Sequence, residues 1–175
     1  LAVQSVIGAL PDQRGIYPRL TSRENIRYFG QLHGLNGSAL ESRINHLIDL
    51  LDMQDIADRR CNGFSTGQAL KVAIARALVH DPHNVLLDEP TNGLDVMSTR
   101  AMRQFVLRLR DEGKCVLFSS HIMQEVSALC DQIVVIAQGQ VVASGSADHL
   151  RQTTGQTNLE DAFIAAIGSE EGLVR

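Results

Sequence analysis

Apolar residues follow two spacings along this chain, one typical of strands and one typical of helices. Short runs rich in Val, Ile, Leu and Phe predict strands, and these runs cover residues 3–10, 85–87, 115–118, 133–137 and 141–143. Gln138-Gly139 lies between the last two runs and predicts a hairpin turn. Elsewhere, apolar residues recur every three or four positions, which predicts helices with one buried face.

Capping signals show where several of these helices begin. A Ser or Thr followed three residues later by Glu or Gln can bond the free backbone amides of a helix start. The chain has three such pairs, which are Thr21 with Glu24, Ser38 with Glu41, and Ser65 with Gln68. We therefore expect helices over residues 21–33, from 38 onward, over 65–78, from Ser98 or Thr99 to a C-terminal Gly113, over 122–130 and over 159–167. The expected buried positions are Leu40, Ile44, Leu47, Ile48 and Leu51 on the second helix, and Met102, Phe105, Val106 and Leu109 on the fourth.

Strands that alternate with helices predict an α/β fold with a largely parallel sheet. A composition of 44% hydrophobic and 21% charged residues over 175 positions is that of one ordinary globular domain. The net charge of −4 gives no electrostatic reason to expect nucleic acid or anionic lipid as the main partner. The three cysteines form no C-x-x-C pair and indicate neither a zinc site nor a disulfide framework.

Two adjacent acids follow the apolar run at residues 85–87. Open α/β sheets place their ligands at the carboxyl ends of the strands. We expect Asp88 to hold Mg²⁺ there, directly or through water, as the strand-end Asp of nucleotide hydrolases does. We expect Glu89 to point the other way along the pleat and to polarise a water, and Pro90 to stop the strand.

The helix start at Ser65 is a second candidate site. With Ser65 as N-cap, the backbone amides of Thr66, Gly67 and Gln68 lie at a positive helix end that suits an anion. Gly67 lets that anion approach closely because it has no side chain. Taken alone, however, this stretch is explained as well by a capped helix without a ligand.

Several motifs in order resemble those of ABC ATPases. F-S-T-G-Q with V-A-I-A-R-A-L resembles the signature motif, and V-L-L-D-E-P looks like the Walker B strand with its catalytic Glu. G-L-D at 93–95 is similar to the D-loop, V-L-F-S-S-H at 116–121 to the switch strand and histidine, and residues 7–25 to the Q-loop segment. The resemblance covers about residues 5–147. It implies a partial ABC ATPase domain of the P-loop NTPase type, with a mostly parallel sheet and a helical subdomain.

The resemblance also implies a division of the chain and a role for each candidate residue. Residues 1–20 would hold the first strand and Q-loop, 21–80 the helical subdomain with the signature, 81–147 the catalytic part, and 148–175 a helical tail. The residues that would contact nucleotide are Ser65, Thr66, Gly67 and Gln68 in trans, with Asp95 at the dimer seam. Asp88 would hold the metal in cis, Glu89 would be catalytic, and His121 would contact the γ-phosphate and orient the attacking water.

The sequence departs from the family pattern at specific points. It contains no G-x-x-x-x-G-K-[ST] loop and starts at Leu1, so we expect that an N-terminal part has been lost from it. Asp12 stands at the Q-loop position with Gln13 after it, and either side chain is a candidate to meet the metal. Thr66 stands where many members have Gly. The resulting F-S-T-G sequence looks like the variant found in bacterial exporter ATPases, including sodium-extrusion types.

The function implied is the ATP-hydrolysing subunit of a bacterial ABC exporter that uses ATP and Mg²⁺. Its partners would be a membrane permease, which about residues 21–60 would dock, and a second ATPase subunit that is identical or paralogous. Nucleic acid would not be a partner. The protein would lie on the cytoplasmic face of the inner membrane. Two alternatives stay open, namely a soluble ABC ATPase acting on nucleic acid or ribosomes, and an inactive fragment. The first is less favoured because only about fifty residues without heptads separate the Q-loop from the signature.

Overall fold

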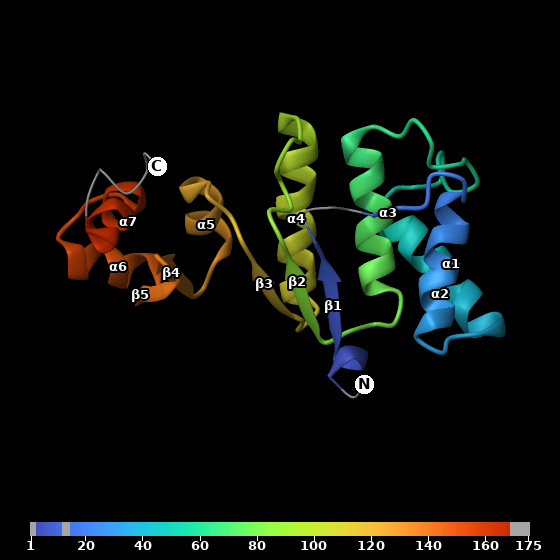
Figure 1. Ribbon diagram of the computed structural model, residues 1–175, viewed down its shortest axis with the longest axis horizontal. Helices are drawn as coiled ribbons and strands as arrows, with labels where there is room; N and C mark the ends of the chain where they lie inside the picture. The colour runs from blue at the N-terminus through green and yellow to red at the C-terminus, as the bar shows by residue number, and fades with distance from the viewer. Residues whose placement is uncertain (1–2, 12–14, 169–175) are drawn as a thin grey trace. The chain divides into compact units, whose positions relative to one another are not determined.

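The computed structural model describes residues 3–11 and 15–168 in two compact units, divided between Ser119 and Ser120. Figure 1 shows the elements of each unit, labelled in chain order. No helix in the described ranges is both long and apolar enough to span a membrane.

The first unit is built on a sheet of three parallel strands in the order β1-β2-β3. β1 (Ile7–Leu10) pairs with β2 (Asn84–Leu87), which pairs with β3 (Cys115–Phe118). Their last residues, Leu10, Leu87 and Phe118, are in register, so the three carboxyl ends lie side by side. The predicted parallel sheet is confirmed.

The first strand is shorter than expected. Residues 4–6 form a 3₁₀ turn, η1 (Gln4–Val6), and extended pairing begins only at Ile7. Its partner β2 starts at Asn84, just after Pro82, which has no amide to donate to a ladder. Residues before Ile7 therefore have no continuation of β2 to pair with.

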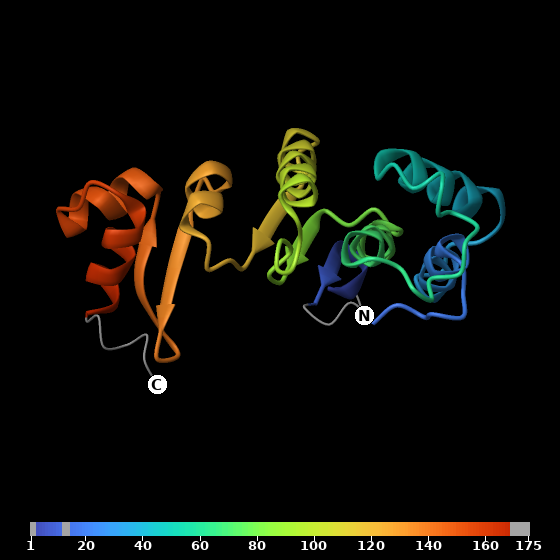
Figure 2. The same cartoon turned by 90° about the horizontal axis from the view of Figure 1, so that it is seen from above.

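Helices pack beside this sheet. α3 (Thr66–Leu78) lies against β1, and α1 (Ser22–Leu32) and α2 (Gly37–Leu50) pack on α3, on its side away from the sheet (Figure 2). α4 (Val96–Asp111) packs on β3. The buried positions of α2 and α4 are those expected from their spacing, namely Leu40, Ile44, Leu47, Ile48 and Leu51, and Met102, Phe105, Val106 and Leu109.

Two of the three predicted capping boxes are present, at Thr21 and Ser65. The box at Ser38 and Glu41 is wrong, because α2 begins earlier, after Asn36, with no side-chain cap. The Glu41 carboxylate instead accepts hydrogen bonds from Arg27, at 2.7 Å from Nε and 2.9 Å from Nη2. A bidentate, charge-assisted pair is stronger than a bond to a neutral backbone amide, which accounts for the choice.

The start of α4 also differs from the prediction. The N-cap is Asp95, whose Oδ1 accepts a hydrogen bond from the Ser98 amide at 2.8 Å, so the helix begins at Val96 rather than at Ser98 or Thr99. At the other end Glu112 is the C-cap, and Gly113 follows with a φ of 79°. Gly113 thus takes the left-handed position that ends many helices.

The second unit holds α5 (Met123–Leu129), the antiparallel hairpin β4 (Ile133–Ala137) and β5 (Gln140–Gly145), α6 (Ala147–Thr154) and α7 (Leu159–Ile167). The hairpin turn at Gln138 and Gly139 has positive φ at both residues, as a two-residue hairpin requires. The core of this unit contains Val126, Val135, Leu150 and Leu159.

Candidate functional site

The two adjacent acids lie at the carboxyl edge of the parallel sheet. β2 ends at Leu87, and the Asp88 amide donates a hydrogen bond to the Leu10 carbonyl of β1 at 2.9 Å. On the other side, the Ser119 amide donates to the Leu87 carbonyl at 3.0 Å. The backbone around Asp88 is therefore fixed to both neighbouring strand ends, where ligands of open α/β sheets bind.

Ser119 joins the two acids through its side chain. Its hydroxyl donates a hydrogen bond to Asp88 Oδ1 at 2.7 Å and accepts one from the Glu89 amide at 2.8 Å. Sequence reasoning missed this residue. The available signal was a hydroxyl residue directly after residues 115–118, a strand expected to run parallel to the acidic strand.

Glu89 is held in an unusual backbone conformation. Its φ is +43°, in the left-handed region that disfavours residues with a Cβ by about 1–2 kcal/mol. The expectation that Glu89 follows the strand pleat is wrong, because β2 ends two residues earlier and a turn begins. The Asn92 amide closes that turn on the Glu89 carbonyl at 3.0 Å, and Pro90 and Thr91 within the turn are buried. Glu89 is half-buried and Asp88 is exposed.

The carboxylate at this edge suits Mg²⁺, which binds to few protein ligands, better than it suits a metal whose ligands all come from the protein. Across residues 3–11 and 15–168, no three His, Cys, Asp or Glu side chains are grouped closely enough to hold a metal ion. Mg²⁺ is commonly bound by one or two carboxylates together with substrate phosphates and water. Asp88, exposed and fixed by Ser119, fits the part of a single carboxylate ligand.

The start of α3 forms the second group of predicted residues. Ser65 Oγ accepts a hydrogen bond from the Gln68 amide at 3.2 Å, and Gln68 Oε1 accepts one from the Ser65 amide at 3.1 Å. The Gln68 amide, predicted as an anion donor, is thus already bonded by the cap. Ser65 and Thr66 are exposed at this positive helix end.

The loop before α4 packs against this helix start within one chain. A Cβ at Gly67 would lie 3.3 Å from Ser98 Oγ, and one at Gly93, where φ is +71°, would lie 3.9 Å from Thr66 Cγ2. Asp95 also belongs to this surface, because both its oxygens accept hydrogen bonds from Ser98, at 2.8 Å from the amide and 3.1 Å from the hydroxyl. The bond from the Ser98 amide is the main reason that the pKa of Asp95 lies below its usual value.

Three predicted candidates remain, namely His121, Asp12 and Gln13. His121 belongs to the second unit, where it is exposed between Ser120 and the start of α5. Asp12 and Gln13 lie outside the described residues. The structure thus groups Asp88 and Glu89 around Ser119, and residues 65–68 beside Asp95.

The known proteins that this chain resembles are ATP-binding proteins and ABC transporter components. A family model described as "ABC transporter" matches residues 2–92. "ABC transporter ATP-binding protein NatA" of Bacillus subtilis (strain 168) is 44% identical over 166 residues, covering 94% of this chain and 68% of that protein. "Linearmycin resistance ATP-binding protein LnrL" of the same organism is 32% identical, covering 93% of the chain and 55% of that protein.

Two further matches extend this set. "Nod factor export ATP-binding protein I" of Burkholderia lata (strain ATCC 17760 / DSM 23089 / LMG 22485 / NCIMB 9086 / R18194 / 383) is 34% identical, covering 80% of the chain and 46% of that protein. A solved structure described as "Structure of ATP binding subunit of ABC transporter" superposes with a TM-score of 0.81 at 26% identity. That match covers 93% of this chain and 68% of the other. The chain therefore spans about half to two thirds of the length of these proteins.

Proposed function

Because this chain belongs to the ABC transporter family of ATP-binding proteins, we propose that it is the ATP-hydrolysing subunit of a bacterial exporter. In the full-length protein, ATP and Mg²⁺ bind, and hydrolysis drives a separate membrane permease between its inward and outward states. The name of the Nod factor export relative supports export as the direction of transport. The subunit is placed peripherally on the cytoplasmic face of the inner membrane.

The observation that carries this proposal is the arrangement of Asp88, Ser119 and Glu89 at the sheet edge. Asp88 would hold Mg²⁺, which would supply positive charge against the phosphates. The Glu89 carboxylate would accept a hydrogen bond from a water and take up its proton as the water oxygen attacks the γ-phosphorus in line and the bond from that phosphorus to the ADP oxygen breaks. The Ser119 hydroxyl, 2.7 Å from Asp88 Oδ1 and 2.8 Å from the Glu89 amide, holds the two acids in a fixed relation.

The start of α3 is proposed to act on ATP held by a second subunit. Ser65, Thr66 and Gly67 present a helix N-terminus, which attracts the negative γ-phosphate. Asp95 lies beside these residues, because it bonds Ser98 and Ser98 lies next to Gly67. A second subunit that contacts the start of α3 would therefore also contact Asp95. The second subunit is a copy of this chain or a paralogue.

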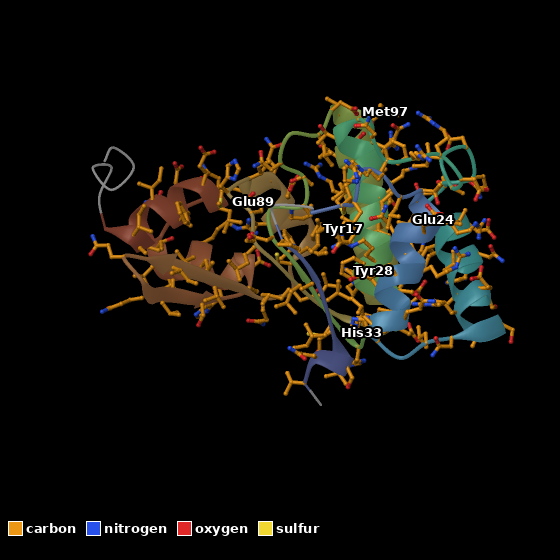
Figure 3. All side chains as sticks on the ribbon, turned by 45° about the vertical axis from the view of Figure 1, so that its right-hand side comes forward. Tyr17, Glu24, Tyr28, His33, Glu89 and Met97 are labelled. Carbon is orange, nitrogen blue, oxygen red and sulfur yellow. The ribbon has the colours of Figure 1, made fainter. Side chains whose placement is uncertain are left out.

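Residues 21–60 are proposed to dock the permease. Tyr28 and Leu32 are exposed one turn apart on α1, and Tyr17 packs edge-on against Tyr28 with ring centroids 5.4 Å apart (Figure 3). A cavity of about 450 Å³ opens beside them, lined in part by Phe29 and Leu32. An apolar surface rimmed by polar groups is typical of a protein contact.

The test is ATP turnover by the full-length protein carrying Glu89→Gln. We expect kcat to fall by at least about 100-fold while ATP still binds, since the amide cannot polarise the water as a carboxylate does. Glu112→Gln, the same change at the exposed C-cap of α4, is the matched control and should leave kcat unchanged. Full turnover by the Glu89→Gln protein would overturn the assignment.

A further inference from the structure

A buried carboxylate lies one turn from His121 in the second unit. Glu125, on α5, is 1% exposed, although charged side chains are rarely buried so fully without a purpose. The next residue, Val126, belongs to the core with Val135, Leu150 and Leu159. Glu125 is therefore anchored to the rigid part of this unit, and His121 is exposed at its surface.

A hydroxyl group connects this carboxylate to the histidine loop. Ser120 Oγ lies 3.5 Å from Glu125 Oε2, to which it donates a hydrogen bond, and it accepts one from the Ile122 amide at 3.1 Å. The Glu125 amide donates to the Ile122 carbonyl at 2.9 Å. The residues on both sides of His121 are thus bonded to one another and to Glu125.

The bond between Ile122 and Ser120 also crosses the histidine. Ile122 is the N-cap of α5, and its side chain makes no capping bond. The Ser120 hydroxyl accepts a hydrogen bond from the backbone amide of Ile122 itself. Because the acceptor is two residues before the N-cap, this bond spans His121 and restrains its backbone.

We propose that Glu125 and Ser120 are positioning residues that hold His121 in the orientation required for ATP hydrolysis. The inference rests on the proposed function, in which His121 contacts the γ-phosphate. Groups that orient a reacting side chain commonly change rates by 10–100-fold when they are removed, although they do not touch the substrate. A purely structural Glu125 would instead affect stability and leave the chemistry of folded protein unchanged.

The experiment compares Ser120→Ala and Glu125→Ala in the full-length protein with its permease. Each change should lower kcat about tenfold and leave KM for ATP within about twofold, because binding does not depend on the angle of His121. Glu125→Gln keeps an acceptor for the Ser120 hydroxyl and should recover most of the rate. Glu160→Ala is the control, because it removes an exposed carboxylate from the first turn of α7. It should leave both kcat and KM unchanged.

A double-mutant test shows whether the effect passes through His121. In a His121→Ala background, adding Ser120→Ala or Glu125→Ala should lower kcat no further. A full tenfold additional loss would overturn the proposal, as would wild-type kcat in Ser120→Ala and Glu125→Ala proteins that are folded. If Glu125→Ala fails to fold, Ser120→Ala decides the question, since it removes only one oxygen atom.

A second readout separates this inference from the proposed function. In NMR spectra of the ¹³C-histidine-labelled chain, Ser120→Ala should move the ring signal of His121 and leave that of His149 in place. An unmoved His121 signal would refute the positioning role whatever the activity. If His121→Ala retains full kcat while Ser120→Ala moves the His121 signal, the proposed role of His121 fails but its restraint by Ser120 stands.

Discussion

At the scale of single residues, the candidate site depends on one hydroxyl group. Ser119 Oγ donates to Asp88 Oδ1 at 2.7 Å and accepts from the Glu89 amide at 2.8 Å. The second of these bonds supports a residue whose φ is +43°, a conformation that a Glu rarely adopts without local restraint. Strain of this kind is often found at functional sites, where it fixes a reactive group in advance.

Ser119→Ala is therefore expected to impair catalysis more than folding. In the full-length protein kcat should fall by about 10-fold or more, because Asp88 and Glu89 lose their shared partner. The free energy of unfolding should fall by about 1 kcal/mol for the lost hydrogen bonds. Steady-state ATPase assays and urea titration measure the two effects, with Ser127→Ala, at an exposed position on α5, as control. A large loss of stability with unchanged kcat would contradict the prediction.

The sequence predicted where the two acids lie in the fold better than it predicted their geometry. The positions of Asp88 and Glu89 followed from an apolar run that ends in two acids, because strand ends are where ligands bind in this fold class. The run is not buried throughout, since Leu86 is exposed. The orientation of Glu89 did not follow, since a left-handed turn leaves no trace in apolar spacing. Ser119 was missed because its role depends on β3 lying beside β2, a pairing between segments 31 residues apart.

At the scale of elements, helix starts show how far local patterns reach. The boxes at Thr21 and Ser65 formed as predicted, but the one at Ser38 did not, because Glu41 bonds Arg27 on α1 instead. That partner is fourteen residues away and becomes available only when α1 and α2 pack together. Burial on α2 and α4 was predictable because it depends on spacing within one helix.

Two of the three predicted caps, Thr21 and Ser38, give a matched pair of substitutions. Thr21→Ala should lower the free energy of unfolding by about 1 kcal/mol, because it removes the acceptor of the Glu24 amide, 3.1 Å away. Ser38→Ala should change it by less than about 0.5 kcal/mol, because α2 has no side-chain cap for it to lose. Chemical denaturation of both proteins measures the difference. Equal losses from the two changes would mean that Ser38 does cap α2.

Acid should weaken the contact among α1, α3 and β1. His33 and His80 stack with ring centroids 3.6 Å apart, and His80 Nε2 bonds the Ile7 carbonyl at 3.0 Å. Burial, and then the charge of His33, hold the pKa of His80 below its ordinary 6.5. The bond to the Ile7 carbonyl and the charge of Asp81 oppose this effect, while Arg43 lowers the pKa further. His80 Nδ1 is buried and has no hydrogen-bond partner in the described part of the chain, so a proton there would be poorly solvated.

The direction of the pH effect follows from this lowered pKa. Above the ordinary value both folded and unfolded His80 are neutral, and below it the unfolded chain takes up the proton first. The free energy of unfolding should therefore begin to fall as the pH drops below about 7.5, and it should keep falling until the folded His80 itself takes up the proton. His80→Gln should flatten this dependence in urea titrations, while His83→Gln, at an exposed position, should not. A wild-type slope that persists in His80→Gln would assign the effect to other groups.

At the scale of the whole molecule, the chain carries the groups proposed to act on a phosphate, but its sequence lacks the glycine-rich motif that would hold one. The acids at the β2 end and the start of α3 are present, yet no G-x-x-x-x-G-K-[ST] occurs in the 175 residues. At the start of α3, the Gln68 amide is already bonded to Ser65, which leaves one amide fewer for a phosphate. ATP affinity in this family fold depends on a loop that encloses the phosphates.

The 175-residue chain is accordingly expected to show no detectable ATP turnover and only weak ATP binding. Calorimetric titration with MgATP and a phosphate-release assay measure both quantities, with the full-length protein as reference. Turnover at the full-length rate would mean that the phosphates are held by residues within this chain, and the division of labour proposed between the sheet edge and a separate loop would be wrong. Weak binding that Asp88→Asn removes would show that the sheet edge recruits the metal without that loop. The binding measurement is the more informative of the two, because the carboxylate of Asp88 is exposed and fixed by Ser119 and is therefore available to a metal ion in this chain.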